Sequence, residues 1–439
     1  MKRRELPELR PPAFAYHGAA PQKQLYCELH CEEVALESLA ARHGTPLYIY
    51  SAAMIRARLN SFARAFRSAP HTLCYSVKAN STLGILRLIA SERSGFDVVS
   101  GGELQRVLRV SRKSAAKVVF SGVGKTAAEM ELALRSGILL FNIESASELD
   151  LLAATALRLK KKAAIAIRVN PDVSAKTHPY ISTGLHQHKF GVPIPEAQAL
   201  YAHAARQPYL KVAGVSVHIG SQITDVGSFK AALERVADLV RALRTQGHDI
   251  RYIDAGGGLG ISYEGPPADF EKQIAAYARA VLAPLRGLKL HLLLEPGRSI
   301  VGPAGVLLTR VLYRKTNNRK RFLIVDAAMN DLLRPSLYGA YHEIVPVSRG
   351  SRETEAIAET TDVVGPICET GDFFARDRKI PLASEGDLLA ILDVGAYGSV
   401  LGSNYNTRGR AAEVLVDGTQ TRVIRRRESF EDQLSSEMF

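Results

Sequence analysis

The chain of 439 residues exceeds the usual length of a single domain, so we expect two domains or one large barrel with an addition. Hydrophobic residues make up 46% and charged residues 23% of the chain, as in ordinary globular proteins, and no apolar stretch approaches the length that spans a bilayer. The 57 basic and 44 acidic residues leave a net charge of +13, but the basic runs lack interleaved aromatic side chains, so we expect neither nucleic acid nor a membrane as a partner.

The first 45 residues begin with a basic segment, followed by a strand-like run at 24–29 and a helical pattern at 32–44. No apolar h-region follows the basic start, so we expect neither a secretory signal nor a transit peptide, and a cytoplasmic location. The cysteines are too few and too scattered for a disulfide framework, and we interpret them as ordinary thiols with no metal site. They are Cys27, Cys31, Cys74 and Cys368.

From about residue 70 to 300, a short β-rich apolar run is repeatedly followed by a break and a longer stretch with helical spacing. The runs occupy 72–77, 95–100, 117–122, 139–145, 163–170, 212–220, 250–258 and 288–297. Apolar strands that alternate with helices indicate a parallel sheet covered on both faces, and eight of them fit a closed (β/α)8 barrel. A doubly wound open sheet is the alternative, although no G-x-G-x-x-G motif follows the first run.

Beyond about residue 305 the pattern changes to strand-like runs without long helices between them, which indicates a separate β domain. The pattern alone does not decide whether the first 45 residues pack on the barrel or on this β domain.

The C-terminal ends of barrel strands converge on one mouth, where active sites lie. Here these ends carry polar and glycine residues, namely Lys78, His218, Ser221, Gly256, Gly257, Gly258, Glu295, Gly297 and Arg298. A lysine, a histidine, a glycine triplet and a Glu/Arg pair at four strand ends indicate a functional site.

A partly desolvated lysine amine is nucleophilic and suits Schiff-base chemistry, and a glycine run after the seventh strand can cradle a phosphate. An aldolase acting on a sugar phosphate and a pyridoxal phosphate (PLP) enzyme both fit these features. Glu295 favours the PLP enzyme, because an acid beside the pyridine nitrogen keeps that nitrogen protonated. His218 would suit stacking on the cofactor ring.

Ten stretches make the chain similar to a known family. They are YSVKANS, DVVSGGEL, FNIES, RVNPDVSAKTHPYISTGLHQHKFG, VHIGSQ, DAGGGLGISY, EPGRSIVG, MNDLLRPSLYGAYH, GPICETGDFF and GAYGSVLGSNYNTR. In this order they resemble the alanine-racemase-like (fold type III) PLP-dependent decarboxylases, over about residues 25–425. Variants at His186, His188, Asp393 and Ser399 have no assigned effect.

The resemblance implies a fold and an assembly. A PLP-binding (β/α)8 TIM barrel would occupy residues 46–305, and a β-sandwich or β-barrel-like domain would combine residues 1–45 with 306–439. The protein would be a homodimer with active sites shared across the interface.

The resemblance also implies a role for each matching residue. Lys78 would form the Schiff base with PLP, His218 would stack on the ring and Glu295 would pair with the pyridine nitrogen. The phosphate would be bound by Ser221, Gly257, Gly258, Gly297 and Arg298. Cys368 would donate a proton across the dimer interface into the partner's barrel. Substrate contacts would come from Arg298, Arg334, Tyr338, Glu369 and Tyr397, with Tyr397 also near the phosphate.

The activity implied is decarboxylation of meso-2,6-diaminopimelate to L-lysine and CO2, the last step of lysine biosynthesis. A decarboxylase acting on ornithine, arginine or D-lysine is the alternative, but an arginine such as Arg334 would have no use on a substrate whose distal end is only an amine. A racemase would need a base on each face, and a non-catalytic PLP-binding protein should lack the β domain or the acid Cys368.

Overall fold

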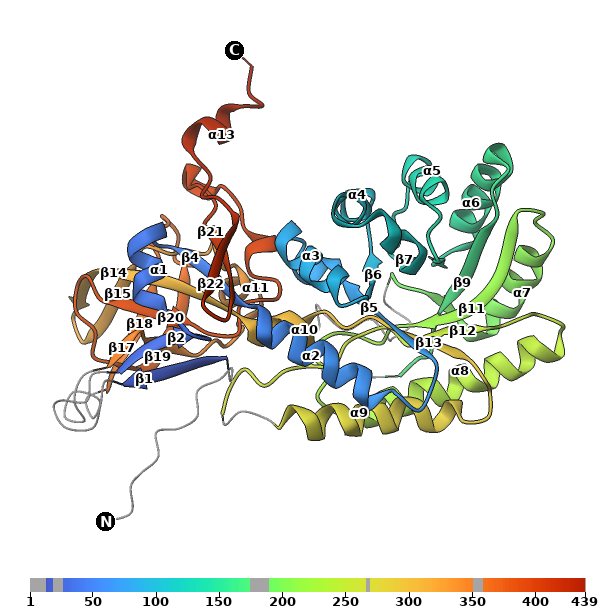
Figure 1. Cartoon of the computed structure of the whole chain (residues 1–439), viewed down its shortest axis with the longest axis horizontal. Helices are drawn as coiled ribbons and strands as arrows, with labels where there is room; N and C mark the ends of the chain where they lie inside the picture. Colours follow the sequence, from blue (N-terminus) through green and yellow to red (C-terminus); the bar gives the residue numbers. More distant parts are fainter. Residues whose placement is uncertain (1–12, 19–26, 174–188, 266–268, 350–357, 439) are drawn as a thin grey trace. The chain divides into compact units, whose positions relative to one another are not determined.

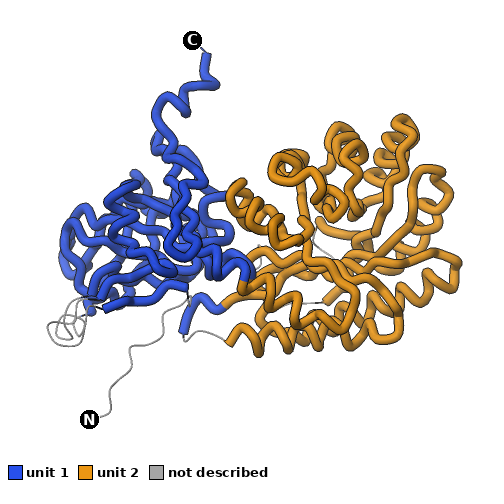
Figure 2. Tube along the Cα trace, in the orientation of Figure 1, with its two compact units in different colours: residues 1–56, 262–268, 300–439 blue, residues 57–261, 269–299 orange. Residues whose placement is uncertain are grey.

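The computed structural model describes residues 13–18, 27–173, 189–265, 269–349 and 358–438. The chain divides into two compact units (Figure 2). The barrel unit comprises 57–261 and 269–299, and the β unit comprises 1–56, 262–268 and 300–439. Within the described ranges, every helix is too short or too polar to traverse a lipid bilayer.

Parallel strands close into a barrel in the barrel unit (Figure 1). Around the barrel they are β9 (Ala163–Asn170), β11 (Leu210–Val217), β12 (Tyr252–Asp254), β13 (His291–Leu294), β5 (His71–Ser76), β6 (Gly95–Val98), β7 (Val118–Phe120) and β8 (Leu140–Ile143). The pairing of β8 with β9 closes the ring, and the two-residue β10 (Val192–Pro193) adds to β9. The predicted eight-stranded parallel barrel is confirmed.

Helices connect successive strands. They are α3 (Leu83–Ser91), α4 (Gly101–Val110), α5 (Ala127–Ser136), α6 (Ala146–Leu159), α7 (Ile194–Ala205), α8 (Gly227–Thr245) and α9 (Phe270–Leu285), while α2 (Ala52–Ala65) begins in the β unit. The side chains of Ser100, Thr126 and Ser145 cap α4, α5 and α6 by accepting backbone N–H groups in the first turn. Such caps stabilise a helix by about 1 kcal/mol and define where the chain leaves the strand end.

The barrel interior is layered. An apolar cluster consists of Cys74, Val119, Leu140, Ala166, Ala213 and Leu293. Two residues further along five of these segments lie the buried polar residues Ser76, Ser121, Asn142, Arg168 and Glu295. Because side chains on a strand repeat with a period of two, these polar residues point inward above the apolar layer. These five polar residues therefore form a layer above the packed apolar core, and we call this layer the polar floor.

The β unit is built mainly from sheets. One runs β19 (Phe373–Pro381), β18 (Ala358–Val364), β15 (Lys320–Val325), β14 (Gly305–Asn317), β4 (Leu47–Ser51), β21 (Ala412–Asp417) and β22 (Gln420–Arg425). Strand β20 (Leu388–Ile391) pairs with β14 and with β16 (Ile344–Pro346). A smaller sheet combines β1 (Phe14–Gly18), β2 (Cys27–Cys31), β3 (Val34–Ala35) and β17 (Ser348–Arg349). The predicted fold class, a TIM barrel with a mostly-sheet domain, is confirmed.

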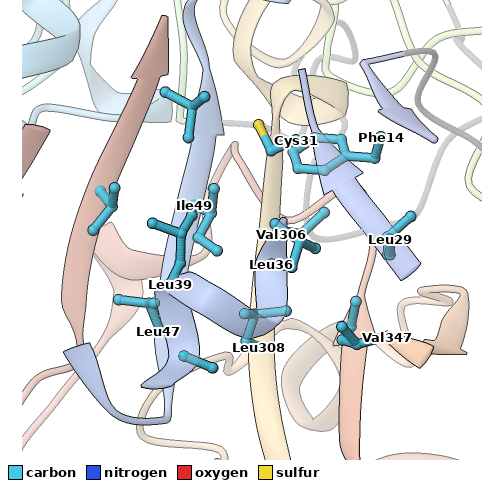
Figure 3. Packing of buried hydrophobic residues seen from close by; sticks show 14 of the residues in the cluster. Phe14, Leu29, Cys31, Leu36, Leu39, Leu47, Ile49, Val306, Leu308 and Val347 are labelled. Carbon is cyan, nitrogen blue, oxygen red and sulfur yellow. The ribbon is translucent and has the colours of Figure 1, made fainter. Parts of the chain in front are cut away.

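The N-terminal segment contributes to the core of the β unit. Helix α1 (Leu36–His43) buries Leu36 and Leu39 in a cluster with Ile49 of β4 and with Val306 and Leu308 of β14 (Figure 3). Each such side chain stabilises the fold by about 1.5–3 kcal/mol when fully buried. The β unit therefore depends on residues more than 250 positions apart in the sequence.

Candidate active site

Lys78 lies just beyond β5, in the single turn Val77–Ala79. Its Nζ donates to Asp97 Oδ2 at 3.1 Å, and Ser76 Oγ donates to the same oxygen at 2.8 Å. The Asp97 side chain is fully buried, whereas 37% of the Lys78 side chain is exposed. Oδ1 of Asp97 is buried without a hydrogen-bond partner among the described residues. A buried carboxylate therefore holds the amine at the C-terminal end of the strands while the amine stays accessible.

Asp254 and Glu295 form a carboxyl pair at the ends of the neighbouring strands β12 and β13, and they are hydrogen-bonded to each other. Asn142 Nδ2 donates to Asp254 Oδ2 at 2.6 Å, and Ser121 Oγ donates to Glu295 Oε1 at 3.3 Å. Burial and the charge of Asp254 raise the pKa of Glu295 well above its usual range, and burial also raises the pKa of Asp254. The pair therefore retains a proton to a higher pH than an ordinary carboxyl group does.

His218 follows β11 directly and lies against the glycine run. The backbone N–H of Gly257 donates to His218 Nδ1 at 3.2 Å, so Nδ1 carries the lone pair and the ring proton is on Nε2. Desolvation, followed by the charges of Arg168 and Lys78, lowers the pKa of His218 well below its usual range. The imidazole is therefore neutral.

The glycine run has no room for side chains. A Cβ atom on Gly257 would lie 2.1 Å from the carbonyl oxygen of Glu295, and one on Gly258 would lie 2.4 Å from that of Gly220. Gly258 also has a φ of +105°, which favours glycine. The run thus presents bare backbone beside the carboxyl pair.

Ser221 and Arg298 lie together at the ends of β11 and β13. Arg298 is buried and its Nη2 donates to Ser221 Oγ at 3.3 Å. Gly297 precedes it, and a Cβ there would approach the Cβ atoms of Ser76 and Ala79 to 3.0 Å. A cation, a hydroxyl and a glycine therefore lie at the same strand ends as Lys78.

A buried ion pair supports these strand ends. Arg168 Nη1 donates to Glu144 Oε1 at 2.9 Å, and Arg168 Nη2 reaches the carbonyl oxygen of His218 at 3.5 Å. Glu144 also accepts the N–H groups of Gly122 and Gly191. These contacts tie the ends of β7, β8, β9 and β11 together.

In the β unit, the segments carrying Arg334 and Cys368 are tethered to each other. Arg334 begins the short helix α11 (Arg334–Tyr338), and Ser336 Oγ in the same helix donates to the carbonyl oxygen of Gly371 at 2.6 Å. Asp372 accepts the N–H groups of Met329 and Ile367, both at 2.7 Å. These bonds make one structural block of residues 329–342 and 365–372, which we call the recognition block.

The remaining predicted substrate residues also lie in the β unit. Cys368 and Glu369 are exposed in the recognition block, and Glu369 accepts a hydrogen bond from Tyr405. Tyr338 is half-buried at the end of α11. Tyr397 is half-buried in a separate loop and has a φ of +56°, an uncommon backbone conformation for a residue other than glycine.

The structure thus brings the predicted barrel residues together and gathers four β-unit residues, Arg334, Tyr338, Cys368 and Glu369, in the recognition block. Most of the stretch 168–191, including His186 and His188, lies outside the described residues.

Known proteins are similar to this chain over most of its length. Residues 52–302 match the family model "Pyridoxal-dependent decarboxylase, pyridoxal binding domain". Diaminopimelate decarboxylase from Pseudomonas aeruginosa is 53% identical over 412 residues, which cover 93% of this chain and 97% of that protein. The corresponding enzyme from Neisseria meningitidis serogroup A is 51% identical over 411 residues, which cover 93% of this chain and 99% of that protein. The chain belongs to the diaminopimelate decarboxylase family.

A solved structure of this family agrees with the fold. Diaminopimelate decarboxylase from Helicobacter pylori, complexed with L-lysine, matches with a TM-score of 0.86 and 44% identity, covering 91% of this chain and 98% of that one.

PLP is the cofactor of the matched domain, and the barrel residues fit it. Lys78 supplies an accessible amine, the protonated carboxyl pair suits a ring nitrogen, and neutral His218 offers a flat face. The bare backbone of the glycine run fits a phosphate.

Several residues of this diaminopimelate decarboxylase family member have no role predicted from the sequence. Asn142 and Arg168 belong to the polar floor of the barrel, and Asp97 and Asp254 are hydrogen-bonded to residues of that floor. In the β unit, His342 binds Arg334. A signal existed for the barrel residues, because each interrupts an otherwise apolar strand run. A polar group in such a run is costly unless it is hydrogen-bonded, so it indicates a buried network.

Proposed function

We propose that this protein decarboxylates meso-2,6-diaminopimelate to L-lysine and CO2, the last step of lysine biosynthesis. The observation that carries the proposal is the identity of about half the residues, over 93% of the chain, with proteins named diaminopimelate decarboxylase. The barrel geometry supports it by supplying an amine, a proton-retaining acid and an anion cradle at one mouth.

PLP, when bound, supplies a protonated pyridine ring that accepts the electron pair left when CO2 departs. The protein's residues prepare for this chemistry. Lys78 would provide the amine that holds the cofactor. Glu295 would offer its proton to the pyridine nitrogen, and burial together with the charge of Asp254 raises the pKa of Glu295 so that it retains this proton. His218, whose pKa is lowered by burial, would pack on the ring without adding a competing charge.

The phosphate and substrate contacts are also part of the proposal. Ser221, Gly257, Gly258, Gly297 and Arg298 bind the phosphate, with Tyr397 near it. Arg298, Arg334, Tyr338, Glu369 and Tyr397 contact the substrate. Two carboxylates and a distal amine require both cationic and acidic partners, and Arg334 and Glu369 of the recognition block supply both.

Cys368 donates the proton that replaces CO2, and we propose that it does so in a homodimer, into the partner's barrel. Its exposure in the β unit is consistent with a residue that acts on another surface. We also propose a cytoplasmic location, which the four free thiols support, because free thiols suit a reducing compartment.

A substrate panel tests the proposal. The PLP-loaded protein should release CO2 from meso-2,6-diaminopimelate and should leave ornithine, arginine and D-lysine almost unchanged. A preference for one of these three would refute the substrate assignment and would favour the alternative decarboxylase, with the PLP chemistry intact.

A further inference from the structure

The buried guanidinium of Arg334 is held by a histidine. Arg334 Nη1 lies 2.8 Å from His342 Nε2, and the two residues are 5% and 0% exposed. His342 Nδ1 lies 2.8 Å from the carbonyl oxygen of Leu392. Because a carbonyl oxygen can only accept, Nδ1 carries the imidazole proton, and Nε2 offers its lone pair to Arg334. His342 therefore acts as a neutral acceptor.

Both side chains are fixed from further directions. The Cζ atom of Arg334 lies 4.6 Å from the ring centroid of Tyr263, a cation–π distance. The rings of Tyr263 and His342 meet edge to face, with centroids 5.2 Å apart and an angle of 76°. Arg378 Nη1 donates to the carbonyl oxygen of His342. The imidazole and the guanidinium therefore have little freedom to reorient.

The same chain holds other arginines by carboxylates. Arg168 pairs with Glu144 at 2.9 Å, and Arg425 pairs with Glu413. A carboxylate partner orients a guanidinium but also offsets its charge. A neutral imidazole orients it through a hydrogen bond and contributes no negative charge. His342 thus orients the Arg334 guanidinium without itself offsetting its charge.

We propose that His342 is a positioning residue for carboxylate recognition. It aims Arg334 at a carboxylate of the diaminodicarboxylic acid substrate without itself placing a negative charge beside the guanidinium. The inference rests on the proposed function, in which Arg334 binds the substrate.

Two substitutions separate the two hydrogen bonds of His342. In His342→Gln, the amide oxygen is as many bonds from Cα as Nε2 and can accept from Arg334. In His342→Asn, the amide nitrogen is as many bonds from Cα as Nδ1 and can donate to Leu392, but no acceptor reaches Arg334. The Gln variant is the matched control for the Asn variant.

In the PLP-loaded enzyme, His342→Asn should raise KM for meso-2,6-diaminopimelate roughly ten- to a hundredfold, as expected when a hydrogen bond to a charged group is lost. The kcat of His342→Asn at saturating substrate should change much less than its KM. The KM of His342→Gln should stay within about threefold of the wild-type value.

Ligand binding gives a readout independent of turnover. Titration of the cofactor absorbance should show that His342→Asn weakens L-lysine, which has a carboxylate, and spares 1,5-diaminopentane, which has none. An unchanged KM, an equal loss for both ligands or equal damage in the Gln variant would overturn the inference. Failure of the wild type to act on diaminopimelate would instead refute the proposed function.

Discussion

The carboxyl pair predicts a specific pH dependence of stability. In the apoprotein, burial raises the pKa of Glu295 and of Asp254 above the ordinary carboxyl range of the unfolded chain. At pH values between the unfolded carboxyl pKa values and the raised pKa values of the folded state, the folded protein therefore binds more protons than the unfolded chain. The stabilisation is complete below the unfolded pKa values and is lost as pH rises through the folded ones.

One retained proton corresponds to a slope of about 1.4 kcal/mol per pH unit in the free energy of unfolding. In Asp254→Asn, the charge of Asp254 is removed while the shape is kept. Burial, the larger cause of the raised pKa of Glu295, remains, so we expect this pKa to fall and the slope to end at a lower pH than in the wild type. Between pH 6 and pH 8, the stability difference from the wild type should change by up to about 2.7 kcal/mol.

Urea unfolding of the apoproteins at several pH values measures this difference. Glu103, whose pKa burial raises to about 7, titrates in both proteins, so only the difference between the two slopes is diagnostic. Asp249→Asn, at an exposed position, is the control and should keep the wild-type slope. A wild-type slope in Asp254→Asn at every pH would show that the charge of Asp254 does not raise the pKa of Glu295 and would refute the reasoning.

Three further substitutions test individual contacts. Lys78→Ala should abolish the borohydride-reducible cofactor absorbance, and survival of that absorbance would assign the cofactor to another lysine. Gly257→Ala should lower the cofactor content measured after desalting, because its Cβ would meet the Glu295 carbonyl oxygen at 2.1 Å; full content would show that the run tolerates side chains. Lys125→Met should lower the free energy of unfolding by about 3–5 kcal/mol, because it leaves buried Glu148 without its 2.6 Å ion pair. Lys160→Met, at an exposed position, is the control. If Lys125→Met lowers the free energy of unfolding by no more than Lys160→Met does, the buried pair does not stabilise the protein.

The barrel could be predicted because its signals are local. Each strand is a short apolar run, and some of the following helices begin at a capping residue such as Ser100 or Ser145. Both signals depend on residues only a few positions apart in the sequence. The strand-end residues Lys78, His218 and Glu295 were found in the same way, since parallel strands bring their ends to one mouth.

The contacts of Asp97, Asp254 and His342 could not be predicted in this way. Asp97 binds Lys78 across two neighbouring strands, and Asp254 meets Glu295, which lies 41 positions further along the chain. His342 lies near Arg334 in sequence, but its role depends on Leu392 and Tyr263, which come from distant segments. Hydrophobic periodicity predicts which face of an element is buried, but it does not predict which residue a buried polar side chain will bind.

The recognition block has a consequence for protein engineering. The hydrogen bonds of Ser336 and Asp372 hold its two segments together. Arg334 and Cys368 therefore lie in one structural unit. A designer who moved only residues 329–342 into a relative with another substrate would break both tethers. We therefore expect that chimeras exchange substrate preference cleanly only when residues 329–342 and 365–372 are transplanted together.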